Sequence, residues 1–176
     1  MPFAQEPDLD DGPTPERAFQ NVLKKEIISI LEKKKADGQL FEYSLFESFG
    51  LDFVIFLKRN SNECSTKFFE LKAFMGHRQG GVGFGNGQGR GAQVDILLQK
   101  SEQLAFLNHF MRWILVDGTK ERGTSRYAIF DNNHAKKAAM GIVQRGKQNN
   151  FRISDLMTKP FRWEKLSKEI EVFLFS

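Results

Sequence analysis

Three ionisable residues stand on two neighbouring apolar segments of the chain: Asp52 in "LDFVIFLK", and Glu70 and Lys72 in "TKFFELKAF". Both segments are rich in β-forming residues, and the short polar stretch "RNSNECS" between them predicts an antiparallel hairpin. Side chains alternate along a strand, so Glu70 and Lys72 share a face, as Asp52 does with Phe56. We therefore expect Asp52 and Glu70 to approach each other where the sheet opens.

Two carboxylates that lie this close together stay ionised only if a cation lies between them. A hard ion such as Mg²⁺ binds one or two carboxylates, a carbonyl and several waters, so Asp52, Glu70 and the backbone carbonyl of Leu71 form the expected ligand set. Such an ion binds phosphate oxygens and lowers the pKa of a bound water, which Lys72 could orient or deprotonate. Glu47, near the hairpin turn, could replace Asp52. Alternatively, Asp52 caps a turn, and Glu70 and Lys72 form an exposed ion pair.

The segment 13–38 predicts an amphipathic helix in front of these strands. Pro15 suits its first helical position, and Gly38 follows the last turn. Glu26 falls inside the apolar stripe, where an acid is unexpected unless it has a function. At 100° per residue, that stripe consists of Phe19, Val22, Leu23, Ile27 and Ile30.

The remaining pattern predicts an α/β domain in which a mixed central sheet is flanked by helices. Short connectors favour three consecutive antiparallel strands, and a later apolar segment adds a further strand after a helix. The expected strands are 40–46, 51–58, 66–74, 111–118 and 125–131, and the expected further helices are 92–110, one around 134–143, and 162–176.

With these elements in place, residues 16–117 resemble the PD-(D/E)XK nuclease superfamily, which has the restriction-endonuclease-like fold. Its common core runs helix, three antiparallel strands, helix and strand, and its signature is an Asp followed by Glu-x-Lys. The matching residues here are Asp52 in "GLDFVIF" and Glu70 and Lys72 in "FFELKAF". The resemblance implies a metal-dependent endodeoxyribonuclease that uses Mg²⁺, with Mn²⁺ able to substitute.

The resemblance also implies a role for Glu26, because many members carry an acidic residue on the first helix that reaches the metal or its water. Leu51 stands where the written motif has proline, and members without that proline are common. A site-specific, type II-like restriction endonuclease is the first expectation, acting on double-stranded DNA as a homodimer. The alternatives are a structure-directed repair or junction-resolving nuclease and a non-catalytic nucleic-acid-binding module.

The segment 76–91 is half glycine and predicts a mobile loop. It contains a G-x-G-x-x-A pattern, but its glycines extend beyond that pattern and it lacks the lysine of a P-loop, so no nucleotide cofactor is expected. Arginine suits guanine edges and phosphates, and amide side chains suit adenine. The candidate nucleic-acid-binding residues are Arg78, Asn86, Gln88, Arg90 and Gln93.

Charge is distributed unevenly along the chain of 176 residues, whose formal net charge is +4. Residues 1–16 carry five acids and no base, so the rest carries +9, which favours a polyanion such as nucleic acid. We expect a flexible acidic arm at 1–15 and one nuclease domain at 16–176. The lone Cys64 and the lack of a secretion signal or membrane span favour a cytoplasmic protein without a membrane partner.

Overall fold

The computed structural model describes residues 15–48, 51–75, 81–83, 107–118, 126–131, 133–134, 150–152, 159–160 and 163–176. Two of its helices are long, and most of its strands belong to one sheet. In chain order the elements are α1 (Pro15–Ala36), β1 (Glu42–Ser48), β2 (Leu51–Lys58), β3 (Cys64–Met75), β4 (Gly81–Gly83), α3 (Leu107–Phe110), β5 (Met111–Gly118), β6 (Arg126–Phe130), β7 (Asn150–Arg152), β8 (Lys159–Pro160) and α6 (Trp163–Phe175).

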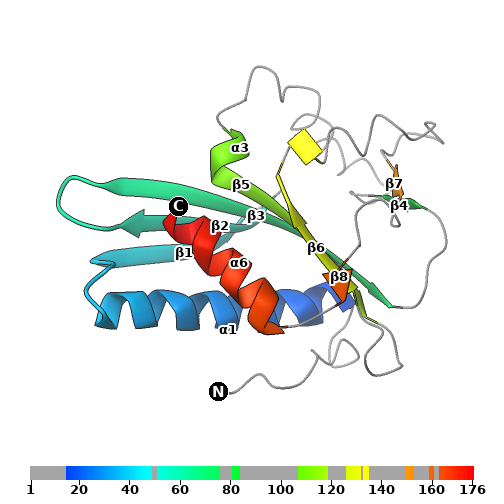
Figure 1. Ribbon diagram of the computed structural model, residues 1–176, viewed down its shortest axis with the longest axis horizontal. Coiled ribbons are helices and arrows are strands. Elements are labelled where there is room, and N and C mark those ends of the chain that lie inside the picture. The colour runs from blue at the N-terminus through cyan, green and yellow to red at the C-terminus, as the bar shows by residue number, and fades with distance from the viewer. Residues whose placement is uncertain are drawn as a thin grey trace.

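The main sheet has six strands in the order β1-β2-β3-β5-β6-β8 (Figure 1). The pairs β1–β2 and β2–β3 are antiparallel, β3–β5 is parallel, and β5–β6 and β6–β8 are antiparallel. Strands β4 and β7 form a separate antiparallel pair. The expected mixed sheet, with three antiparallel strands followed by a later one, is therefore present, and the chain has the predicted α/β character.

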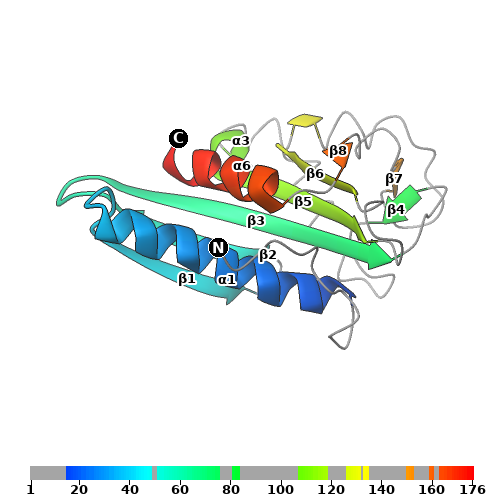
Figure 2. The ribbon, with the colours of Figure 1, turned by 60° about the horizontal axis from the view of Figure 1, so that its bottom comes forward.

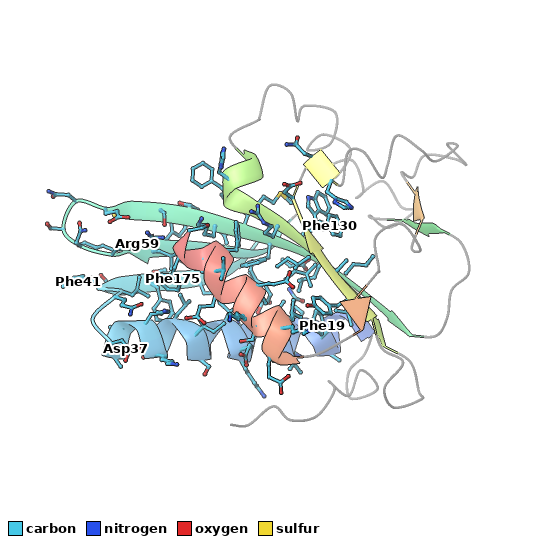
Figure 3. The ribbon with its side chains drawn as sticks, viewed as in Figure 1. Phe19, Asp37, Phe41, Arg59, Phe130 and Phe175 are labelled. Atoms are coloured by element: carbon cyan, nitrogen blue, oxygen red, sulfur yellow. The ribbon has the colours of Figure 1, made fainter. Side chains whose placement is uncertain are left out.

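Helices α1 and α6 lie side by side on one face of this sheet (Figure 2). The stripe expected on α1 is buried there: Phe19, Leu23 and Ile27 are fully buried. Figure 3 labels Phe19 on α1 and Phe175 near the end of α6. The sheet contributes the alternate residues of its strands to the same core, namely Phe53, Ile55, Leu57, Phe69, Leu71, Ala73, Ile114, Val116 and Tyr127. The opposite residues inside the β2–β3 ladder, such as Val54 and Phe68, therefore face away from the two helices.

The turn after α1 fixes how the chain enters β1. Gly38 has a φ of 71°, the left-handed conformation that commonly ends a helix. The N–H groups of Gln39 and Leu40 donate to the carbonyl of Lys34 at 2.9 and 3.1 Å. These bonds satisfy the end of the helix and reverse the chain, so that β1 runs back beside α1 (Figure 2).

Strands β2 and β5 have the predicted bounds, while β1 starts and ends two residues later than predicted and β3 is longer at both ends. The predicted last helix is confirmed as α6, and its apolar end, with Phe173 and Leu174, is buried. Of the helix predicted at 92–110, only α3 is described, and most of 134–143 lies outside the described residues. The predicted arm at 1–15 lies outside the described residues except for Pro15. The predicted loop at 76–91 lies outside them except for β4 (Gly81–Gly83). None of the helices in the described part is long and apolar enough to span a bilayer.

Lys67 is a buried cation on β3, with only 3% of its surface exposed. Its Nζ lies 4.7 Å from the centre of the Phe173 ring and donates to the backbone carbonyl of Ser176 at 3.2 Å. Burial lowers the pKa of Lys67, and repulsion from Arg59 and Arg112 lowers it further. The folded protein therefore holds this proton less tightly than the unfolded chain does.

The substitution Lys67→Met tests this effect. Between the lowered folded-state pKa and the ordinary value of 10.5, the unfolded chain binds more protons, so the wild type gains stability as the pH rises through that window. The variant lacks this gain, so its free energy of unfolding relative to wild type falls between about pH 7 and about pH 10. Urea titrations at both pH values measure the difference. The same substitution at exposed Lys33 is the control, and a difference at Lys67 that is constant with pH would contradict the expectation.

Candidate active site

Asp52 lies at the point where the β2–β3 ladder ends. The last paired residues of this ladder are Phe53 and Phe69, and one further step in the same register places Asp52 opposite Glu70. Both acids are partly buried. The backbone N–H of Leu71 donates to Oδ2 of Asp52 at 2.6 Å. The structure thus brings Asp52 to the Glu70–Leu71 segment, although Asp52 and Leu71 are 19 residues apart in the chain.

This hydrogen bond replaces a bond of the ladder. If the pairing continued, the N–H of Leu71 would face the main chain of β2 near Leu51, but the carboxylate of Asp52 accepts its proton instead. The N–H and the carbonyl of one strand residue point to the same side of the strand. The carbonyl of Leu71 therefore also points toward the Asp52 side of β3, as the expected ligand set requires.

Helix α1 supplies a second contact to Asp52, through Gln20. The Nε2 amide of Gln20 donates to Oδ1 of Asp52 at 3.3 Å, and the Nη1 of Arg17 donates to Oε1 of Gln20 at 2.7 Å. Sequence reasoning missed Gln20 because it is neutral. At 100° per residue it lies between Ile27 and Leu31, 20° from each, and both are fully buried. A polar residue at such a position is the signal that could have identified it.

Glu47 on β1 does not take the place of Asp52, because it is paired with two cations of α1. Its carboxylate lies 2.7 Å from Nζ of Lys24 and 3.0 Å from Nη1 of Arg17. The hydrogen bond from Lys24, followed by that from Arg17, lowers the pKa of Glu47. These ion pairs link α1 to β1, and surface pairs of this kind contribute about 0–1 kcal/mol each.

Glu26, the acid expected to assist at the metal, contacts α6 instead. It accepts a hydrogen bond of 2.5 Å from Oγ of Ser167 in a partly buried setting. Glu26 lies six residues beyond Gln20, which is roughly 9 Å further along the helix axis and about 240° around it. Gln20, and not Glu26, is the α1 residue that the structure places beside Asp52.

The other predicted residues are described only in part. The backbone of Lys72 belongs to β3 and pairs with Leu115 of β5, but its side chain lies outside the described residues. The predicted nucleic-acid-binding residues all lie outside the described residues as well: Arg78, Asn86, Gln88, Arg90 and Gln93.

The donor groups around Asp52 fit a magnesium ion that keeps several waters. Among the side chains that the structure describes, no group of three or more His, Cys, Asp or Glu residues is placed to hold a metal. The candidate set is smaller, since it consists of two carboxylates and the Leu71 carbonyl, which is a set that Mg²⁺ uses when water completes its shell. Asp52 accepts the N–H of Leu71 at Oδ2 and the amide of Gln20 at Oδ1, and a carboxylate with about four lone-pair sites can accept such bonds and bind a cation as well.

We compared the chain with protein-family models, curated proteins and solved structures, and none of them matches it. Its function is therefore inferred from the Asp and Glu-x-Lys motif and from the way the described residues lie. Of these, the contacts around Asp52 are the most informative, because they join β2, β3 and α1 at one point.

The contact between Glu26 and Ser167 predicts a measurable coupling between α1 and α6. Glu26→Met and Ser167→Ala each remove one partner, and we expect the double variant to lose about 1 kcal/mol less stability than the sum of the single losses. Chemical denaturation of the four proteins measures this coupling. Pairing Glu26→Met with Ser44→Ala, at an exposed position of β1, provides an additive control. Additive losses for Glu26 and Ser167 would mean that the hydrogen bond contributes nothing.

Proposed function

We propose that this chain is a Mg²⁺-dependent endonuclease that hydrolyses DNA phosphodiester bonds. The observation that supports it most is the 2.6 Å hydrogen bond from Leu71 N–H to Asp52, which holds the aspartate of β2 against the middle of the Glu70–Leu71–Lys72 sequence. The motif predicted this convergence from spacing alone. An antiparallel hairpin that ends its ladder at this step is the arrangement that makes the convergence possible.

In this proposal Asp52, Glu70 and the carbonyl of Leu71 hold the ion. When bound, Mg²⁺ offsets negative charge that develops on the phosphate and lowers the pKa of a water. Lys72, as the motif implies, orients the attacking water or accepts its proton. Proton transfer of this kind contributes about 10²- to 10⁴-fold to a rate.

DNA is the proposed substrate, because the chain beyond residue 16 carries a charge of +9 and the motif is that of DNA nucleases. Cleavage of both strands with one site per chain is simplest for a two-fold homodimer, so we propose that the active form is a dimer. Within the class, a site-specific restriction endonuclease comes first and a structure-directed nuclease second.

One contact favours a different function, that of a non-catalytic nucleic-acid-binding module. The carboxylate of Asp52 satisfies the N–H of Leu71 where the ladder stops, which is a structural task that needs no chemistry. In that case the basic charge serves binding, and the acids of β2 and β3 serve the fold.

Incubation with supercoiled plasmid and Mg²⁺, with EDTA as the control, separates these functions. Discrete fragments indicate a site-specific endonuclease, a smear indicates a nonspecific nuclease, and loss of either with EDTA confirms that a metal is needed. A plasmid that stays intact in Mg²⁺ and in Mn²⁺ while the protein shifts its mobility would favour the binding module.

Lys72→Ala is expected to reduce cleavage by about 10²- to 10⁴-fold while DNA binding is retained. The matched control is Lys25→Ala, which removes the same charge from an exposed position of α1. Cleavage rates under single-turnover conditions and DNA affinity by fluorescence anisotropy measure the two effects separately. Equal rates for the two variants would remove Lys72 from the mechanism.

A further inference from the structure

Gln20 is a buried amide on the face of α1 that packs against the core. Only 8% of its surface is exposed, and its neighbours Phe19 and Leu23 on α1 are fully buried. Burying an amide without hydrogen-bond partners is costly. Gln20 avoids this cost because both ends of its amide have partners, and one of those partners is Asp52.

The direction of the Gln20 amide is determined by Arg17. A guanidinium only donates, so the end of Gln20 that faces Arg17 at 2.7 Å must be the oxygen. The nitrogen then faces Oδ1 of Asp52 at 3.3 Å and donates to it. Arg17 is held in turn by Glu47, at 3.0 Å. Arg17 therefore donates both to Glu47 and to Gln20, and Gln20 donates in turn to Asp52.

Asp52 is consequently held by donors from two different elements, β3 and α1. Leu71 N–H binds Oδ2 from β3, and Gln20 binds Oδ1 from α1. Two hydrogen bonds to different oxygens fix the plane of a carboxylate as well as its position. Gln20 is a neutral donor, so it does this without placing a positive charge that would repel a cation beside Asp52.

We propose that Gln20 is a positioning residue of this site, which sets the carboxylate plane of Asp52 for the divalent ion and whose own orientation is set by Arg17. This role rests on the proposed function. Partners of this kind, one shell beyond a metal ligand, typically change metal affinity by about 10- to 100-fold when they are removed.

The substitution Gln20→Met keeps the length of the side chain and removes the donor. We expect Mg²⁺, titrated alone by calorimetry, to bind about 10- to 100-fold more weakly than to the wild type. The Mg²⁺ concentration for half-maximal cleavage should shift by the same factor, while saturating Mg²⁺ restores most of the rate. Gln39→Met makes the same chemical change at an exposed position and should leave the affinity unchanged.

If Gln20→Met does not fold, a second pair of variants tests whether Gln20 positions Asp52. Arg17→Met and Lys24→Met each remove one cation from Glu47, and the two side chains are similarly exposed, at 46% and 40%, but Arg17 also donates to Gln20. If Gln20 positions Asp52, Arg17→Met binds Mg²⁺ more weakly than Lys24→Met. If charge alone matters, the two variants bind Mg²⁺ alike.

The outcomes separate this role from the proposed function. If the wild type neither binds Mg²⁺ nor cleaves plasmid, both the proposed nuclease function and the role of Gln20 are contradicted. A wild type that binds and cleaves, together with a folded Gln20→Met variant of unchanged Mg²⁺ affinity, removes the role of Gln20 alone. Equal Mg²⁺ affinities of the Arg17→Met and Lys24→Met variants would also contradict the role of Gln20.

Discussion

The arrangement of the candidate site depends on one hydrogen bond, from the N–H of Leu71 to the carboxylate of Asp52. Where two strands separate, the next N–H of the ladder loses its main-chain partner, and an unpaired buried N–H is costly. Here the carboxylate of Asp52 replaces the missing main-chain acceptor of the Leu71 N–H. Because a charged acceptor makes a short and strong bond, it also fixes the distance between β2 and β3 at the opening. The segment that carries Glu70 is thereby placed beside Asp52 for reasons of backbone satisfaction, before any chemistry is considered.

The core makes this opening rigid. Phe53 and Phe69, the last paired residues before the strands separate, are fully buried under α1 and α6. Phe19 and Leu23 anchor the part of α1 that carries Gln20 in the same core. Groups carried on packed strands and helices are held more precisely than groups on loops, so each of the two hydrogen bonds to Asp52 comes from an element that cannot shift without disturbing the core.

The sequence predicted the strands better than it predicted the contacts between helices. The bounds of β2 and β5 were predictable because each is a short, mostly apolar run, and the short polar connector after β2 predicted that β3 is its antiparallel partner. The role of Glu26 was less predictable. A helical projection shows that Glu26 lies in the buried stripe, but not which element covers it, and Ser167 comes from a helix 141 residues later. Gln20 was overlooked for the opposite reason, since a neutral side chain at the margin of the stripe attracts no attention until its partner is known.

Asp52 can be explained as an acceptor that ends the β2–β3 ladder or as a ligand of a metal ion. The two explanations differ in what they require of Glu70. A ladder end needs only one acceptor for Leu71, and a neutral side chain could provide it. The register instead places a second acid, Glu70, opposite Asp52, and like charges that face each other across two strands destabilise a sheet. Both acids are also partly buried, so water screens them less than it would at the surface. A divalent cation between the two carboxylates would offset this repulsion, so the presence of Glu70 favours the proposed metal-dependent function over a purely structural role for Asp52.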